Sequence, residues 1–587
     1  MFRKYHHWLA GIILVGVSCI FCSTHAAWAN QGHDASVISK KESVLPQTDA
    51  DNFLFGLGYA TTGLADTFSE TGAHQAKLNY GMSSWQAIES NPPEDGKHDY
   101  RWDALDEMIL EYQKRDFTEI HLTLKAKSTW GTQGCTIWDC KPFLPKPEHW
   151  QDYEAYVRAV VERYDGDGDE HDMPGLEYPV RQYEIETEAD AGWPNHCMED
   201  PQDPDRAETY LQVLTAAQRV AREAYPDVQI LPAAMLFYGL FSGEPDAATI
   251  SARRNQDTVE SRAVNCLTNF NEEILRHPEL FDAVEFHFLG DDYREIATTI
   301  RWLREQMQLN GYEKPIYPTD LPTGPALIST SVYKDEFHYY PQDVTEGYLD
   351  VIKDNIDSDA PSQEYLDIRT WYASEQAEFM VKLLLATMEE DGAGVQLASM
   401  TDFPWMFCIP SWYFYNYETW SWGIHGMVEA DWTLLPLPLC PPVDYSEGSP
   451  RPVFHALRWF IANLGEFESA ERLSFSSEKP GISIYAYQIK VKDRLINVLW
   501  AEDGVGQVIG EPKPTADLVL PTNSPTVTVT HVITQMGQTE PIVEVIEAAG
   551  QITLTVSESP IFVKGLQPQQ ADPQNNVYLP LLLKEGE

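Results

Sequence analysis

Basic residues are scarce in this 587-residue chain, which has 41 Lys and Arg against 90 Asp and Glu and a formal net charge of −49 at pH 7. Such a charge repels nucleic acid and anionic membrane surfaces, so we exclude both as partners. A neutral poly- or oligosaccharide is compatible with it, and so is a plain role of the acidic surface in solubility. Charge excludes partners here without naming one.

Long apolar runs are absent beyond the first thirty residues. A single run of about 15 residues, Trp8 to Cys22, follows Arg3 and Lys4 and is shorter than the roughly 20 residues that span a bilayer. Ala27-Trp28-Ala29 then provides small residues at the spacing that a signal peptidase reads. We therefore expect residues 1–29 to be a signal peptide, with a retained anchor as the alternative, and residues 30–50 to be a linker. Removing the leader takes away two basic residues, leaving 39 against 90 acidic and a formal charge of −51, on a protein predicted to be secreted or at the cell surface.

Cysteine is also sparse. Cys19 and Cys22 leave with the leader, and the six that remain are Cys135, Cys140, Cys197, Cys266, Cys408 and Cys440. An even number in an oxidising compartment indicates disulfides, and the close pair Cys135 and Cys140 is suited to closing one loop. No CxxC pair or neighbouring His cluster accompanies them, so a zinc site is a poor alternative. The remaining connectivity stays open.

No Gly-rich phosphate loop follows any predicted strand, which argues against a doubly wound open sheet, the alternative to a barrel. Strands alternate instead with amphipathic helices, a pattern that calls for a parallel sheet. Eight strands are expected, at 53–59, 76–80, 119–124, 180–186, 228–232, 283–288, 315–319 and 394–399. Helices are expected at 150–164, 205–225, 293–310 and 371–390. Eight strands close a (β/α)8 TIM barrel, which we place at residues 51–464.

Helical periodicity ends after Leu464. Short strands broken by Gly, Pro, Asn and Asp follow at 481–487, 495–500, 516–520, 526–532 and 551–556. They predict a small all-β sandwich over residues 465–566, either bracing the barrel or binding sugar. Residues 567–587 read as a polar linker and an apolar C-terminal tail, which is either a sorting or anchoring tag or a strand docked on the sandwich.

Two of the predicted barrel strands are followed by a carboxylate, Glu188 in one case and Asp320 in the other. Because the carboxyl ends of barrel strands meet at one mouth, these two acids are expected to face each other there. Splitting a glycosidic bond needs one protonated carboxyl for the leaving oxygen and one carboxylate that stabilises or attacks the sugar carbon. The pair therefore predicts glycoside hydrolysis.

Other acids are alternatives for each role. Glu184, Glu186 and Glu188 share a face of an ideal strand, so if they point inward their repulsion raises at least one pKa, unless one of them pairs with Arg181. Glu186 is the second choice for the acid, and Asp402 or Glu285 replaces Asp320 if that residue proves remote.

A series of short motifs between about residues 52 and 464 resembles the large clan of (β/α)8 glycoside hydrolases, in particular its xylosidase-like and arabinofuranosidase-like branches. The motifs are Met82-Ser-Ser-Trp85, Ile88-Glu89, Tyr100-Arg-Trp102, Leu105-Asp106, Thr129-Trp130, Arg163-Tyr164, Tyr183 to Glu188, Phe286-His287-Phe288, Lys314 to Asp320 and Trp422-Gly423-Ile424.

The resemblance implies a role for each matching residue. Glu188 takes the place of the acid/base and Asp320 that of the second carboxylate, which in the clan is a Glu. Thr187 stands where the clan has Asn, His287 matches a residue that hydrogen-bonds the second carboxylate or the sugar, and Trp422 resembles the platform under the sugar ring. Asp is one methylene shorter than Glu, which favours inversion or loss of activity over retention.

Aromatic residues are dense in the segments that follow the predicted strands. Trp130, Trp405 and Trp422 are our candidates for sugar stacking, while some of the neighbouring tryptophans are expected to be plain packing. The acidic loop Asp165 to Asp172 alternates oxygen side chains with Gly, but it lacks the glycine and the bidentate Glu of an EF-hand, so a looser calcium site competes with a solvated turn. No metal or cofactor is predicted for the reaction.

The sequence thus predicts a secreted O-glycoside hydrolase. The alternative is a catalytically silent carbohydrate-binding or scaffolding protein on the same barrel. Sugar identity, linkage and oligomeric state are left without a prediction.

Overall fold

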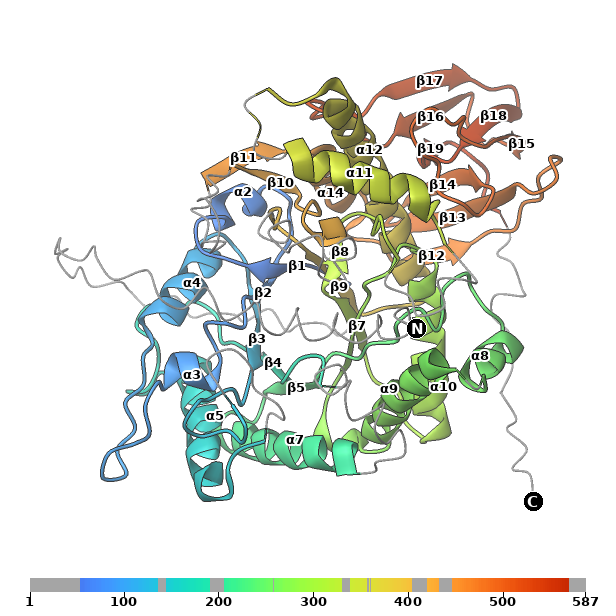
Figure 1. The fold of residues 1–587 in the computed structure, drawn as a ribbon. Coiled ribbons are helices and arrows are strands. Elements are labelled where there is room, and N and C mark those ends of the chain that lie inside the picture. Colours follow the sequence, from blue (N-terminus) through green and yellow to red (C-terminus); the bar gives the residue numbers. More distant parts are fainter. Residues whose placement is uncertain are drawn as a thin grey trace, which may run out of the picture.

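The computed structural model describes residues 53–135, 144–189, 205–256, 258–329, 338–355, 358, 360–403, 420–431 and 446–569 (Figure 1). The predicted leader, Trp405 and the apolar tail lie outside the described residues. No described helix is long and apolar enough to cross a membrane.

Eight parallel strands form the barrel, and each expected strand is confirmed. They are β1 (Leu54–Ala60), β2 (Gln75–Leu78), β3 (Glu119–Leu124), β4 (Gln182–Ile185), β5 (Gln229–Pro232), β6 (Val284–His287), β7 (Ile316–Thr319) and β9 (Gly394–Ala398). Pairing runs β5-β4-β3-β2-β1-β9 in one sheet, with the two-residue strand β8 (Leu321–Pro322) beside β9, and β6 pairs with β7. The bridge of Met235 with Phe286 joins the β5 side to β6, and the Ala393 N–H donates to Ile316 O at 2.9 Å between β9 and β7, so the ring closes.

Helices surround this ring, as Figure 1 shows. The expected helices appear as α5 (Trp150–Tyr164), α7 (Asp205–Ala224), α10 (Glu295–Leu309) and α12 (Gln363–Glu389). The others are α2 (Ala65–Ser69), α3 (Trp85–Ile88), α4 (Asp103–Gln113), α8 (Ala247–Arg254), α9 (Val259–Leu275), α11 (Gln342–Asn355) and α14 (Pro452–Leu464), with short 3-10 turns η2 (Pro147–His149) and η3 (Pro278–Leu280). Apolar side chains fill the layer between strands and helices, for example Val160, Leu214 and Ile300.

Helix α12 begins eight residues earlier than expected. Ser362 caps it by accepting a hydrogen bond from Tyr365 N at 3.2 Å. Most of the helix from Tyr372 to Met388 is buried, because the barrel lies on one side of it and the C-terminal strands on the other (Figure 1). A helix with apolar residues on several faces lacks the clear 3.6-residue repeat of a surface helix that is buried on one face only. The sequence pattern therefore predicted the start of α12 too late.

The C-terminal strands form the expected β-sandwich. A six-stranded antiparallel sheet has the order β12-β13-β14-β19-β16-β17, and β15 pairs with β18 against it. The strands are β12 (Ser469–Arg472), β13 (Ser483–Val491), β14 (Arg494–Glu502), β15 (Thr515–Pro521), β16 (Thr526–His531), β17 (Val543–Glu547), β18 (Gln551–Ser557) and β19 (Ile561–Lys564). A hairpin of β10 (Val428–Asp431) and β11 (Ser446–Pro450) precedes α14. Leu499, Leu518 and Val529 are among the residues of the sandwich's own core, while Trp500 on the other face of β14 belongs to the barrel's core.

Two of the six cysteines that follow the predicted leader lie within the described residues. Cys135 and Cys266 are both disulfide-bonded. The other four lie outside the described residues, so the connectivity stays a prediction.

Candidate functional site

Strand ends bring Glu188 and Asp320 to one mouth of the barrel. Glu188 follows β4 by three residues and Asp320 directly follows β7, and all barrel strands run in the same direction. Both residues have left-handed backbone conformations, with φ of 47° and 45°, as has Glu186 at 63°. Non-glycine residues rarely adopt positive φ, and such strain concentrates at functional sites.

One imidazole lies between the two carboxylates. His287 at the end of β6 has Nδ1 at 2.9 Å from Oε1 of Glu188 and Nε2 at 3.5 Å from Oδ2 of Asp320. The nearest oxygens of the two carboxyls are therefore at most about 9 Å apart, and this upper bound does not exceed the roughly 9.5 Å that separates the two carboxyls of inverting enzymes. The sequence predicted that Glu188, His287 and Asp320 lie at one site, and the structure brings the three residues together.

The charges of this group are coupled. Burial alone would lower the pKa of His287, but the carboxylates of Asp320 and Glu188 raise it to about 9. Burial opposes ionisation of Asp320, yet His287, Lys77 and a hydrogen bond from Tyr59 bring its pKa below the usual value. At neutral pH the site therefore holds an imidazolium beside an ionised Asp320.

Tyr59 is a site residue that sequence reasoning missed. It lies near the carboxyl end of β1, its hydroxyl hydrogen-bonds to Asp320, and its backbone φ is 52°. Its ring lies beside those of Tyr80 at 6.2 Å and Phe403 at 5.9 Å between centroids. The available signal was an aromatic residue at the end of a barrel strand, whereas the predicted sugar-binding aromatic residues are all tryptophans.

Lys77 on β2 was also missed, although a lone Lys in an otherwise uncharged strand was visible in the sequence. Its side chain is 4% exposed, and its ammonium lies 3.1 Å from Oε2 of Glu184 and forms a short ion pair with Glu285. Thr123 and Thr319 donate hydrogen bonds to the same two carboxylates. The barrel interior below the mouth is thus a buried polar network and not an apolar core.

The network assigns Glu184 and Glu285 to structure. Glu186 accepts a hydrogen bond from Ala126 N at 2.5 Å, and burial is the main cause that raises its pKa to about 8. The expected repulsion from Glu184 also raises this pKa but is the smallest of its causes. Asp402 binds Arg451 through both oxygens, at 2.8 and 2.6 Å, and accepts from Gly426 N at 2.9 Å. It ties the segment after β9 to α14, so it is not the partner of Glu188.

The predicted sugar-binding residues Thr187, Trp130 and Trp422 have different surroundings. Thr187 lies between Glu186 and Glu188 in the chain and is buried. Trp130 packs edge-on against Trp85 at 4.7 Å and donates from Nε1 to Glu89 O at 3.1 Å, so its described contacts are packing contacts. Trp422 is half-buried, with its ring 4.9 Å from that of His425. The stacking role of each stays a prediction.

Three groups of acidic and His side chains come close enough to share an ion within the described residues. One is His121, Glu184 and Glu285, but Lys77 already supplies the cation between its two carboxylates. The other two lie on or beside the loop 165–172, where Asp165, Asp167, Asp169 and Asp172 accept hydrogen bonds from backbone N–H groups. The calcium alternative for this loop stays a prediction.

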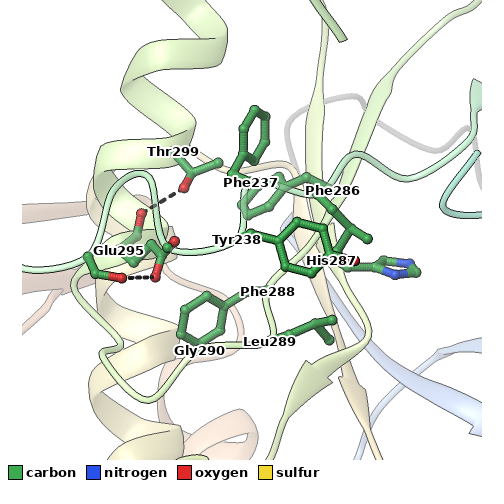
Figure 2. Close-up of a pocket in the computed structure, with 12 residues that line it drawn as sticks. Phe237, Tyr238, Phe286, His287, Phe288, Leu289, Gly290, Glu295 and Thr299 are labelled. Carbon is green, nitrogen blue, oxygen red and sulfur yellow. Dashed lines mark hydrogen bonds between the residues drawn. The ribbon is translucent and has the colours of Figure 1, made fainter. Parts of the chain in front are cut away.

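A small cavity of about 20 Å³ lies behind β6, between the β6 strand end and α10 (Figure 2). Phe237, Phe288 and Glu295 are among its lining residues, and the ring of His287 points away from it. Ser242 donates to Glu295 at 3.0 Å, and burial raises the pKa of Glu295 to about 8. This volume accommodates about one water molecule, so the cavity is not a sugar site.

Several solved structures are similar to this chain over 88% of its length. They include a glucosidase from Croceicoccus marinus (11% identity, 97% of that chain covered, TM-score 0.49), a β-xylosidase from Caulobacter crescentus (13%, 96%, 0.44) and an α-L-arabinofuranosidase from Thermotoga maritima (11%, 97%, 0.44). No protein-family model and no curated protein matches the sequence.

Proposed function

We propose that this chain is an exported O-glycoside hydrolase that acts on a neutral poly- or oligosaccharide through Glu188 and Asp320. The observation that carries the proposal is the contact of both carboxylates with the imidazole of His287, at 2.9 and 3.5 Å. The upper bound of about 9 Å on their separation is compatible with an acid on one side of a glycosidic bond and a carboxylate on the other.

Each carboxylate has surroundings that fit its role. Glu188 has a side chain that is 13% exposed, so it reaches the solvent side of the mouth where a leaving group would lie. Asp320 has a pKa below its usual value and is held by Tyr59, so it is ionised when the sugar carbon gains positive charge. Asp320 then forms a bond to that carbon, or removes a proton from the water that attacks it.

Hydrolysis of a panel of aryl glycosides by wild type and Glu188→Gln tests the proposal. We expect wild type to cleave at least one member, and the variant to lose activity by about 10²-fold to 10⁴-fold, the usual contribution of a general acid. Glu186→Gln, which alters the neighbouring buried acid, is the matched control and should retain most activity. A wild type that cleaves nothing, yet binds an oligosaccharide equally well with and without the Glu188 substitution, is the silent binding protein and refutes the proposal.

A further inference from the structure

The proton that Glu188 needs is not accounted for by the two carboxylates alone. The pKa of His287 near 9 places a proton on the ring that lies between them, so that Nδ1 carries a hydrogen while Nε2 faces Asp320 at an ion-pair distance of 3.5 Å. Its Nδ1–H points to Oε1 of Glu188 at 2.9 Å, so Glu188 is the acceptor of this hydrogen bond. The acid and the catalytic proton thus lie on neighbouring groups.

Resting on the proposed function, we propose that His287 stores the catalytic proton and delivers it through Glu188 to the leaving group when Asp320 loses its charge. The proton passes from His287 to Glu188, while Tyr59 and Asp320 lie on the other side of the ring and set its charge. His287 is buried, with a side chain 1% exposed, so bulk water does not exchange directly with its ring.

Groups from most of the surrounding strands act on this ring. They are Tyr59 on β1 (through Asp320), Lys77 on β2, His121 on β3, Glu188 after β4, Glu285 on β6 and Asp320 after β7. Burial and Lys77 bring the pKa of His121 to about 3, so that ring is neutral. Lys77 disfavours the proton on His287, and Asp320 is the largest influence in favour of it. Retention of the proton on His287 therefore depends on the negative charge of Asp320.

The reaction removes that charge. As the bond to the leaving oxygen breaks, its electron pair stays on that oxygen, and the sugar carbon takes a pair from Asp320 or from a water whose proton passes to Asp320. Asp320 is then neutral, which weakens the hold of His287 on its proton. The Nδ1 proton moves to the Glu188 carboxylate, and the carboxyl group so formed passes that proton to the leaving oxygen, which leaves a neutral imidazole and an ionised Glu188. In the retaining case, the proton of the second water returns through Glu188 to His287 when Asp320 is released.

His287→Asn tests this relay, because the amide keeps a hydrogen-bond donor near the position of Nδ1 but has no proton to give up. Two glycosides of the same sugar are compared, one with a dinitrophenyl leaving group that needs no acid and one with an alkyl leaving group that does. We expect the variant to lose about 10²-fold to 10⁴-fold in kcat/KM on the alkyl glycoside and less than about 10-fold on the dinitrophenyl glycoside. Equal losses on both substrates would overturn the relay, because they indicate only a positioning or structural role.

NMR of the ¹⁵N-histidine-labelled protein gives a readout that does not depend on activity. The signal that disappears in His287→Asn is assigned to His287, and it should report a protonated ring at pH 7.5 that becomes neutral at lower pH in Asp320→Asn than in wild type. A neutral ring at pH 7.5, or a titration that Asp320→Asn leaves unchanged, contradicts the relay. If wild type hydrolyses neither glycoside, the proposed function fails, and the titration alone decides whether His287 stores a proton.

Discussion

Replacing Lys77 by Met tests the polar barrel interior on which the mouth of the site rests. Lys77 is the cation between Glu184 and Glu285, and both carboxylates have fully buried side chains. Breaking a buried ion pair by removing one partner costs about 3 to 5 kcal/mol, because an uncompensated charge stays behind. With two carboxylates left, we expect the upper end of this range for the free energy of unfolding.

Urea unfolding followed by tryptophan fluorescence measures this loss. Lys490→Met is the matched control, since Lys490 pairs with Glu468 on the surface and its side chain is 55% exposed. Surface pairs contribute at most about 1 kcal/mol, so the control should unfold close to wild type. Glu285→Gln added to Lys77→Met should recover part of the stability, because it removes one of the two unpaired charges. A loss under about 1 kcal/mol for Lys77→Met, no larger than that of the control, would refute the reasoning.

Three further predictions concern other parts of the molecule. Glu558 lies at the contact between sandwich and barrel, and burial raises its pKa from a reference of 4.5 to about 8. The protonated carboxyl therefore stabilises the fold at low pH, and this contribution is lost as the pH rises toward 8. The melting temperature of wild type should therefore fall more between pH 6 and pH 9 than that of Glu558→Gln; parallel curves would contradict this. Tyr59→Phe removes a hydrogen bond to the Asp320 carboxylate and should lower kcat/KM by about 10-fold to 100-fold with little change in melting temperature, and an unchanged rate would exclude a positioning role. Gly131→Ala should destabilise the protein by about 1 to 3 kcal/mol in urea unfolding, because the new Cβ would lie 2.4 Å from the Trp85 ring, whereas an unaffected midpoint would mean that the ring has room to move.

The sequence predicted the barrel well, because the hydrophobic periodicity of each segment and the order of strands and helices can be read directly along the chain. All eight barrel strands appear near the positions that the alternation of strands with helices along the sequence predicted. Helix α5 matches its predicted range from Trp150 to Tyr164. Strand ends also predicted the meeting of Glu188 with Asp320, since parallel strands share one mouth.

Contacts across the barrel could not be predicted in the same way. Lys77 and Glu285 are 208 residues apart, and Asp402 and Arg451 lie on segments whose pairing depends on the whole ring. Glu186 and Glu188 have positive φ, so their side chains do not follow the alternating directions of an ideal strand. The sequence pattern gives no indication of this backbone conformation. The predicted sugar-binding aromatic residues are tryptophans, but it is Tyr59 on β1 that makes the contact with Asp320.

A double-variant cycle on one alkyl glycoside, whose leaving group needs an acid, tests most directly whether Glu188 and Asp320 act on the same bond. The measurement compares kcat/KM for wild type, Glu188→Gln, Asp320→Asn and the double variant. Residues that work as a unit are strongly non-additive, so each single change should cost at least about 10²-fold and the double about as much as the worse single. Single variants that stay within about 10-fold of wild type, or two losses that simply multiply, would contradict a shared catalytic site.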